Sequence, residues 1–303
     1  MASARGSAAP YLRMLRVHQW AKNVLIFVPL VAAHEFTDAR AIARAGVAFV
    51  AFSLLASCVY IVNDIQDIEH DRLHPTKRHR PFASGAIPVR TGKMVVPVLA
   101  VIAAGLAINL GWHFSLWLLV YLVTTTLYTF GLKRLVLIDA IVLAVLYTIR
   151  VYAGGAATST PLSYWFIAFS IFLFMSLAFV KRYAELITGD EDDESDTTLA
   201  GRGYRTTDAP LIQILGVAAG FAAALVFAMY INSQNSLALY REPDILWATL
   251  PISTYWVSYM WLRAHRGEMH DDPVIFALRD PASWLTVLAF GAVLTIATIG
   301  WFA

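Results

Sequence analysis

Long apolar runs, separated by short polar stretches, make up most of this chain. A membrane-spanning helix needs about 20 mostly apolar residues, and nine such runs occur in the sequence. They lie near residues 17–34, 41–62, 91–111, 113–131, 135–157, 162–182, 209–231, 244–262 and 283–302. The first is the weakest, because Lys22 and Asn23 interrupt it and Pro29 can kink it. The pattern predicts an all-α polytopic membrane protein with nine transmembrane helices. We expect one domain over residues 1–303, with 1–16 as a flexible tail.

Composition supports the membrane interpretation and excludes several other classes of protein. Hydrophobic residues make up 58% of the 303 residues and charged residues 15%, against roughly 45–50% and about 25% in soluble domains. The net charge of +2 is too small to indicate a nucleic-acid partner. Cys58 is the only cysteine, which excludes an intrachain disulfide and a cysteine-based zinc site. We expect no removable signal peptide, because residues 1–16 lack an apolar core followed by a small-residue cleavage site.

Basic residues predict the orientation of the chain in the membrane. With nine spans, 19 of the 23 Lys and Arg residues fall on one side and three on the other, while Arg150 lies inside a span. The positive-inside rule makes the basic side cytoplasmic, which predicts a multi-pass protein of the inner (plasma) membrane. Most acidic residues fall on the same side. Because a solute carrier needs polar groups reachable from both sides, this asymmetry favours an enzyme with a cytoplasmic active site.

The end of the second span carries the first candidate site. Asn63, Asp67 and Asp71 are four residues apart, so they share one stripe if the helix continues, and Asp64 lies beside them. Carboxylates on one face repel each other unless a cation neutralises them. Ligands that offer only oxygen suit Mg²⁺, which completes its shell with substrate phosphates and water. A solvated helix end at the membrane surface is the alternative interpretation.

Basic residues follow this acidic stretch directly. Lys77, Arg78 and Arg80 stand in the segment from His74 to Gly85. Beside a carboxylate–metal site they are typical of a phosphate clamp, since arginine offers a planar fork and lysine a compact charge. A loop that only contacts lipid headgroups remains the alternative.

Together the two segments resemble a known family. The pattern Asn63-Asp-x-x-Asp67-x-x-x-Asp71, followed by Pro75-x-Lys-Arg-x-Arg-Pro81-x-Ala-x-Gly85, resembles the UbiA superfamily of intramembrane prenyltransferases. The resemblance covers nearly the whole chain. It implies nine helices around a central cavity with an aspartate-rich cytoplasmic mouth and a Mg²⁺ cofactor.

The chain departs from most members of that family after the sixth span. They carry a second Asp-x-x-x-Asp motif there, whereas this chain reads Lys181-Arg-Tyr-Ala-Glu-Leu186. Asp192 and Asp196 have the spacing of the motif but stand in a loop flanked by Gly, Ser and Thr. A solvated charge cluster and a second metal motif both remain possible for them.

Several segments resemble the branch of the family that transfers phosphoribose to decaprenyl phosphate in actinobacterial cell-wall (arabinogalactan) synthesis. These segments are Arg16-Val-His-Gln-Trp-Ala-Lys-Asn23, Gly131-Leu-Lys133, Ile149-Arg-x-x-Ala-Gly-Gly155, Lys181–Leu186 and Ala277-Leu-Arg-Asp280. The resemblance implies 5-phosphoribosyl 1-diphosphate as donor, decaprenyl phosphate as acceptor and pyrophosphate as product. An aromatic prenyltransferase that uses a prenyl diphosphate is the alternative enzyme, and a lipid or solute carrier is the non-enzymatic one.

Such a reaction gathers three anionic groups and therefore needs many cations. Asp64, Asp67 and Asp71 are expected to be catalytic as holders of the metal, together with Asn63. The other predicted substrate contacts are Lys22, Lys77, Arg78, Arg80, Lys133, Arg134, Tyr147, Arg150, Lys181, Arg182, Tyr183 and Glu185.

Arg150 is a special case among these residues, because a charge inside a span is costly and is usually functional or paired. Asp139 is eleven residues away on the same face, about 16 Å along the helix and too far for direct pairing. Either each finds another partner in the bundle, or Arg150 lines the cavity.

Overall fold

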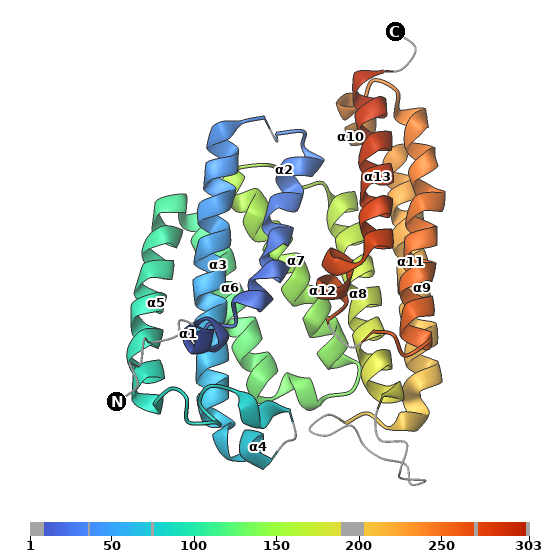
Figure 1. The fold of residues 1–303 in the computed structure, drawn as a ribbon. Coiled ribbons are helices and arrows are strands. Elements are labelled where there is room, and N and C mark those ends of the chain that lie inside the picture. The colour runs from blue at the N-terminus through green and yellow to red at the C-terminus, as the bar shows by residue number, and fades with distance from the viewer. Residues whose placement is uncertain (1–8, 36, 74–75, 189–202, 270–271, 301–303) are drawn as a thin grey trace. The chain divides into compact units, whose positions relative to one another are not determined.

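The computed structural model describes residues 9–35, 37–73, 76–188, 203–269 and 272–300. Within these ranges the chain is helical and contains no strand (Figure 1). Among these described residues, seven helices are long and apolar enough to cross a membrane. They are α3 (Ala39–Gln66), α5 (Val89–Leu110), α6 (Trp112–Phe130), α7 (Ile138–Thr158), α8 (Tyr164–Ile187), α9 (Ala209–Ile231, with a preceding 3-10 turn) and α13 (Pro281–Ile299). The chain is thus an all-helical, multi-pass membrane protein.

The two remaining predicted spans are interrupted, so the count of nine is not confirmed. The first consists of a 3-10 helix, η1 (Val17–Phe27), followed by the short α2 (Val28–Ala32). Polar Asn23 is buried in it, and Pro29 stands at the start of α2. The eighth consists of the 3-10 turn η5 (Pro243–Ala248) and the 17-residue α11 (Thr249–His265).

Short elements connect the long helices. They are α1 (Ala9–Met14), α4 (Ile68–Leu73), η2 (Lys77–His79), η3 (Leu132–Arg134), η4 (Thr206–Asp208), α10 (Gln234–Leu239) and α12 (Pro273–Arg279). The predicted tail is wrong for its second half, because α1 is helical and Met14 is buried against Ile61 and Phe82. Asp192 and Asp196 lie outside the described residues.

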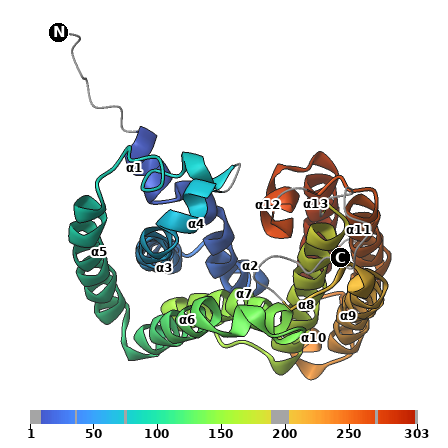
Figure 2. The same cartoon turned by 90° about the horizontal axis from the view of Figure 1, so that it is seen from below.

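By its internal contacts the chain divides into two compact units. The first unit holds residues 1–129 and 149–161, and the second holds 130–148 and 162–303. The single domain expected from the sequence stays a prediction. In the first unit α3 packs against η1 and α5, and Figure 2 shows α3 end-on with these neighbours around it. Phe52 of α3 also packs against Phe114 and Tyr121 of α6, with ring centroids 5.9 and 5.0 Å apart.

A glycine permits the close approach of α7 to η1 in the first unit. A Cβ added at Gly154 would lie 2.1 Å from the carbonyl oxygen of Ile26. Because that contact is with backbone, it can be relieved only by moving a helix. We expect Gly154→Ala to lower the stability of the protein by about 1–3 kcal/mol through overpacking, measured as a fall in the melting temperature of the purified protein. Gly105→Ala is the matched control, since a Cβ there meets nothing within 4 Å. Equal melting temperatures for both variants would contradict the contact.

In the second unit the most extensive packing is between α8 and α9. A Cβ at Gly216 of α9 would lie 2.2 Å from the ring of Trp261 of α11. Small residues of this kind let membrane helices approach closely. The indole of Trp261 also donates to the hydroxyl of Ser176 at 3.1 Å, which joins α11 to α8. The helices α8, α9 and α11 are therefore tightly packed in the second unit, and this packing holds the ends of α8 and α11, with their polar residues, in place.

Candidate active site

A cluster of two carboxylates and two arginines lies at the end of α3 in the first unit. Asp64 and Asp71 are buried, and Nη1 of Arg80 contacts both, at 3.2 and 2.7 Å. Arg16 approaches Asp64 with two nitrogens, Nη2 at 2.5 Å and Nε at 3.2 Å. We call Arg16, Asp64, Asp71 and Arg80 the acid–arginine cluster. Charge-assisted hydrogen bonds of this type are among the strongest in proteins, so the four side chains orient one another.

The predicted continuous helix is interrupted at Asp67, since α3 ends at Gln66 and α4 begins at Ile68, and a different pair of acidic residues converges. The backbone N–H of Asp67 donates to the carbonyl of Asn63, and that of Asp71 donates to the carbonyl of Asp67. Residues seven apart lie nearly two turns apart on one face, which brings Asp64 and Asp71 to the same arginine. Asp67, placed by the sequence at the centre of the stripe, is exposed. Asn63 is half-buried and donates to Thr129 at 3.4 Å.

The acid–arginine cluster has the donor chemistry of a magnesium site. Among the described residues no three His, Cys, Asp or Glu side chains form a group that would hold a metal by themselves. Mg²⁺, however, usually takes only one or two carboxylates and completes its shell with phosphates and water. Two buried carboxylates that already share one positive group meet this requirement, and the oxygens of Asn63 and Asp67 lie on the same helical segment. The residues present therefore fit the ion.

The basic loop after α4 is anchored to the first unit by its own apolar residues. Phe82 is buried with Met14, Ile61 and Ile87, and its ring leaves no room for a Cβ at Gly92, which would lie 2.7 Å away. This packing places Arg80 in the cluster. Lys77 and Arg78, on the turn just before it, are exposed.

Arg150 finds partners inside the first unit. Its Nε donates to the side-chain carbonyl of Asn23 at 2.9 Å, and its guanidinium lies 4.9 Å from the ring centroid of Tyr121. Asn23 in turn donates to Ser53 at 2.9 Å. The structure thus places Arg150 in a buried polar network with η1, α3 and α6. Lys22, next to Asn23 on η1, is half-buried.

A second buried ion pair occupies the second unit. Arg182 is fully buried, and its Nε lies 2.5 Å from Asp139. It also pairs with Glu185, and the phenol of Tyr204 donates to Asp139 and accepts from the backbone N–H of Leu137. Burial and then the hydrogen bond to Asp139 raise the pKa of the Tyr204 phenol. Arg182 therefore braces the second unit internally and, in this arrangement, does not reach solvent.

The predicted cations of η3 stand beside this network. Lys133 is half-buried and Arg134 is exposed. The phenol of Tyr204 holds the backbone of Leu137, which has a left-handed φ of 65° and lies three residues after this turn. The network thus sets the end of the turn that carries both cations.

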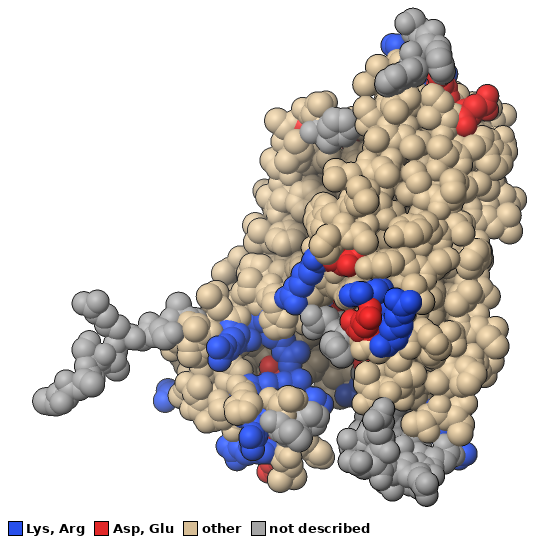
Figure 3. Space-filling view, turned by 45° about the vertical axis from the view of Figure 1, so that its right-hand side comes forward, with Lys and Arg blue, Asp and Glu red and all other residues tan. Residues whose placement is uncertain are grey.

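Lys181 and Tyr147 meet at a carboxylate that the sequence analysis did not select. Asp272 accepts from the Lys181 ammonium at 3.2 Å and from the Tyr147 phenol at 2.8 Å. Tyr183 instead pairs with His265 at 2.9 Å. The signal for Asp272 was present in the sequence, since Asp before Pro273 is typical of a helix start. Arg16 was also missed as a contact, although it opens one of the quoted segments. In the space-filling view, basic and acidic side chains lie together in patches on a surface that is otherwise mostly uncharged (Figure 3).

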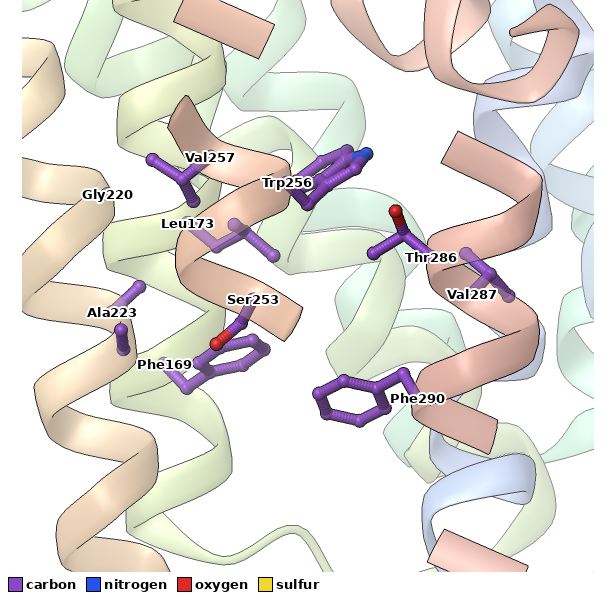
Figure 4. Close-up of a pocket in the computed structure, with 11 residues that line it drawn as sticks. Phe169, Leu173, Gly220, Ala223, Ser253, Trp256, Val257, Thr286, Val287 and Phe290 are labelled. Carbon is purple, nitrogen blue, oxygen red and sulfur yellow. The ribbon is translucent and has the colours of Figure 1, made fainter. Parts of the chain in front are cut away.

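The second unit also contains an apolar cavity of about 220 Å³ between α8, α9, α11 and α13 (Figure 4). Phe169, Phe290 and Trp256 line it together with small residues of α9. The ring of Phe227 packs at an angle against both Phe169 and Phe290, with centroids 5.5 and 5.6 Å apart, and so connects these two lining rings. The cavity is lined by hydrocarbon groups, unlike the acid–arginine cluster and the ion pairs of Arg182.

The described residues thus combine helices that are long enough to cross a membrane with a buried cluster whose residues fit a divalent ion. The chain belongs to the UbiA prenyltransferase family, which matches residues 24–278.

Curated relatives cover most of the chain. It is 40% identical to a decaprenyl-phosphate phosphoribosyltransferase of Mycobacterium tuberculosis. The match covers 96% of this chain and 93% of that relative. It is also 35% identical to nodulation protein NoeC of Azorhizobium caulinodans, and that match covers 92% of this chain and 90% of the relative. An uncharacterized Sinorhizobium fredii protein, y4nM, is 38% identical over 90% of this chain, which spans about half (53%) of that relative's length.

A solved structure shares the fold. A UbiA homolog from Archaeoglobus fulgidus, bound to GPP and Mg²⁺, superposes with a TM-score of 0.71 at 16% identity, covering 94% of this chain and 99% of that one. At this identity the likeness concerns the fold alone.

Proposed function

We propose that the protein transfers 5-phosphoribose from 5-phosphoribosyl 1-diphosphate to decaprenyl phosphate, or a similar polyprenyl phosphate, and releases pyrophosphate. The observation that carries the proposal is the 40% identity, over nearly the whole of both chains, to the mycobacterial phosphoribosyltransferase. The product would be the lipid-linked phosphoribose used for arabinan in the cell wall. We further propose nine spans in the plasma membrane, with the ionic clusters facing the cytoplasm.

The acid–arginine cluster is the proposed place of the donor diphosphate. Asp64 and Asp71, helped by Asn63 and Asp67, would hold Mg²⁺, which when bound offsets the charge that develops on the leaving pyrophosphate. Arg80 and Lys77 contact phosphate oxygens and so stabilise that charge further. Arg16 orients the Asp64 carboxylate through its two nitrogens.

Cations of the second unit are proposed to bind the remaining phosphates. Lys181 and Lys133 are partly exposed and carry charges that such anions need. The acceptor phosphate is itself anionic, so its oxygen attacks the anomeric carbon without a general base. We therefore assign no proton-transfer residue. We assign Arg182 and Arg150 to bracing the helices, because both are buried on protein partners, and Glu185 pairs with Arg182.

Donor choice is the direct test. We expect the purified protein to release pyrophosphate from 5-phosphoribosyl 1-diphosphate when decaprenyl phosphate and Mg²⁺ are present. We expect no release from geranyl diphosphate with an aromatic acceptor such as 4-hydroxybenzoate. Removing Mg²⁺ with a chelator should abolish the reaction. Turnover of the prenyl diphosphate alone would instead establish an aromatic prenyltransferase.

A further inference from the structure

One carboxylate in the second unit is contacted from three helices. Asp272 is only 5% exposed at its side chain, and the Lys181 ammonium of α8 pairs with it at 3.2 Å. The Tyr147 phenol of α7 lies 2.8 Å from each of its two oxygens. The carboxylate also accepts from the backbone N–H of Val274, at the start of α12, at 3.2 Å.

The local sequence explains why this carboxylate is held so firmly. Asp272 is the N-cap of α12, and Pro273 follows at the first helical position, where its fixed φ favours the helix. The cap sets the side-chain direction from its own backbone. Tyr147 then fixes the carboxylate from the opposite helix. Asp272 is thus oriented independently of Lys181.

Lys181 needs such a partner if it is to act at a defined position. A lysine carries its charge on a flexible four-carbon stem, and its ammonium has three donors. A hydrogen bond to a fixed carboxylate restricts the ammonium to one region and directs the other donors away from that carboxylate. The carboxylate also reduces the local positive charge, which opposes the binding of an anion. The carboxylate therefore orients the Lys181 ammonium but weakens its attraction for a phosphate.

We propose that Asp272 is a positioning residue that acts through Lys181, with Tyr147 as its brace. It directs the ammonium toward the phosphate that Lys181 contacts, so the inference rests on the proposed function. Asp272 itself touches no substrate in this assignment. It supplies a fixed carboxylate near the end of α8.

A double-mutant cycle tests this inference. Asp272→Asn keeps an oxygen for the cap and for Tyr147 but loses the charge that holds Lys181. We expect kcat to fall about 10-fold, roughly the effect of one charge-assisted hydrogen bond, while KM for the donor changes less than about threefold. The lost orientation of the Lys181 ammonium weakens its contact in the transition state and so lowers kcat. The lost negative charge favours binding of the anionic donor, which offsets the weaker contact in KM. In a Lys181→Met background, Asp272→Asn should cost less than about twofold further, because the two residues act as one unit.

Controls separate positioning from a structural role. Tyr147→Phe should lower kcat in the same way but less, and its effect should also vanish in the Lys181→Met background. Glu268→Gln removes a carboxylate of the same connection that pairs with Arg263 at 2.6 Å, and it should leave kcat unchanged. Losses that multiply in the Asp272→Asn, Lys181→Met double variant would overturn the proposal, as would an effect on KM alone. The cycle is measured with whichever diphosphate donor the wild-type protein uses, so a wrong donor assignment is recognised separately.

Discussion

Asp64→Asn is expected to lower turnover at least 100-fold. The buried carboxylate of Asp64 accepts from two nitrogens of Arg16 and one of Arg80. An amide keeps one oxygen but turns an NH₂ group toward a guanidinium. Each charge-assisted hydrogen bond lost in a buried site costs roughly 1.5–3 kcal/mol, or about 10- to 150-fold. A proposed ligand of Mg²⁺ is removed as well. The measurement is pyrophosphate release in membranes with matched expression.

The neighbouring acidic residues provide the comparison. Glu69→Gln removes an exposed carboxylate from α4, and we expect turnover near that of the wild type. Asp67→Asn should lie between the two, because Asp67 is exposed and leaves no arginine of the cluster unpaired. If Asp67→Asn were the most damaging of the three, the stripe read from the sequence would describe the site better than the pair on Arg80. Near-normal turnover of Asp64→Asn would remove the cluster from the mechanism.

Arg80→Ala is expected to destabilise the protein as well as to inactivate it. Arg80 bridges Asp64 and Asp71, so its loss leaves two carboxylates close together and partly unpaired. Removing one partner of a buried ion pair costs about 3–5 kcal/mol. Arg80 is 27% exposed at its side chain, and the effect should therefore fall near or below the lower value. The thermal melting temperature of the detergent-solubilised protein measures it.

Magnesium offers a further readout of the same variant. If the two carboxylates accept the ion, Mg²⁺ should raise the melting temperature of Arg80→Ala more than that of the wild type, because the variant lacks the competing cation. Arg80→Lys should recover part of the stability, since an ammonium lacks the planar fork of arginine. Arg90→Ala removes an exposed cation at the start of α5 and serves as control. A melting temperature of Arg80→Ala that does not respond to Mg²⁺ would contradict the metal assignment.

The sequence predicted part of the acid–arginine cluster. Asp64, Asp71 and Arg80 stand within 17 residues of one another, and helical spacing alone put the two carboxylates near one face. The same reasoning placed Asp67 at the centre of the stripe, whereas the structure leaves it exposed, because a helix wheel shows which residues share a face but not which face a distant arginine approaches. Arg16 contacts Asp64 from 48 residues away, and no local pattern predicts that contact.

Arg182 lies in an environment that its local sequence does not indicate. Its position at the end of an apolar run predicts a cation at the membrane surface, free to bind phosphate. The structure buries it completely on Asp139 and Glu185. The sequence analysis noted that Asp139 and Arg150 were too far apart to pair, and the structure gives each another partner. Which partner was undetermined, because α7 and α8 are separate spans and their relative rotation is a property of packing.

The sequence by itself determined the class of protein, seven of its long spans, the family and the acidic motif. These follow from composition, from apolar run length and from residues close together in the chain, all of which act locally. Only the tertiary structure decided that Asp64 and Asp71 share Arg80, that Arg182 is buried, and that Asp272 joins Lys181 to Tyr147. The physical reason is that each of these contacts depends on the rotation and depth at which helices pack, and that packing is determined by side chains far apart in the sequence.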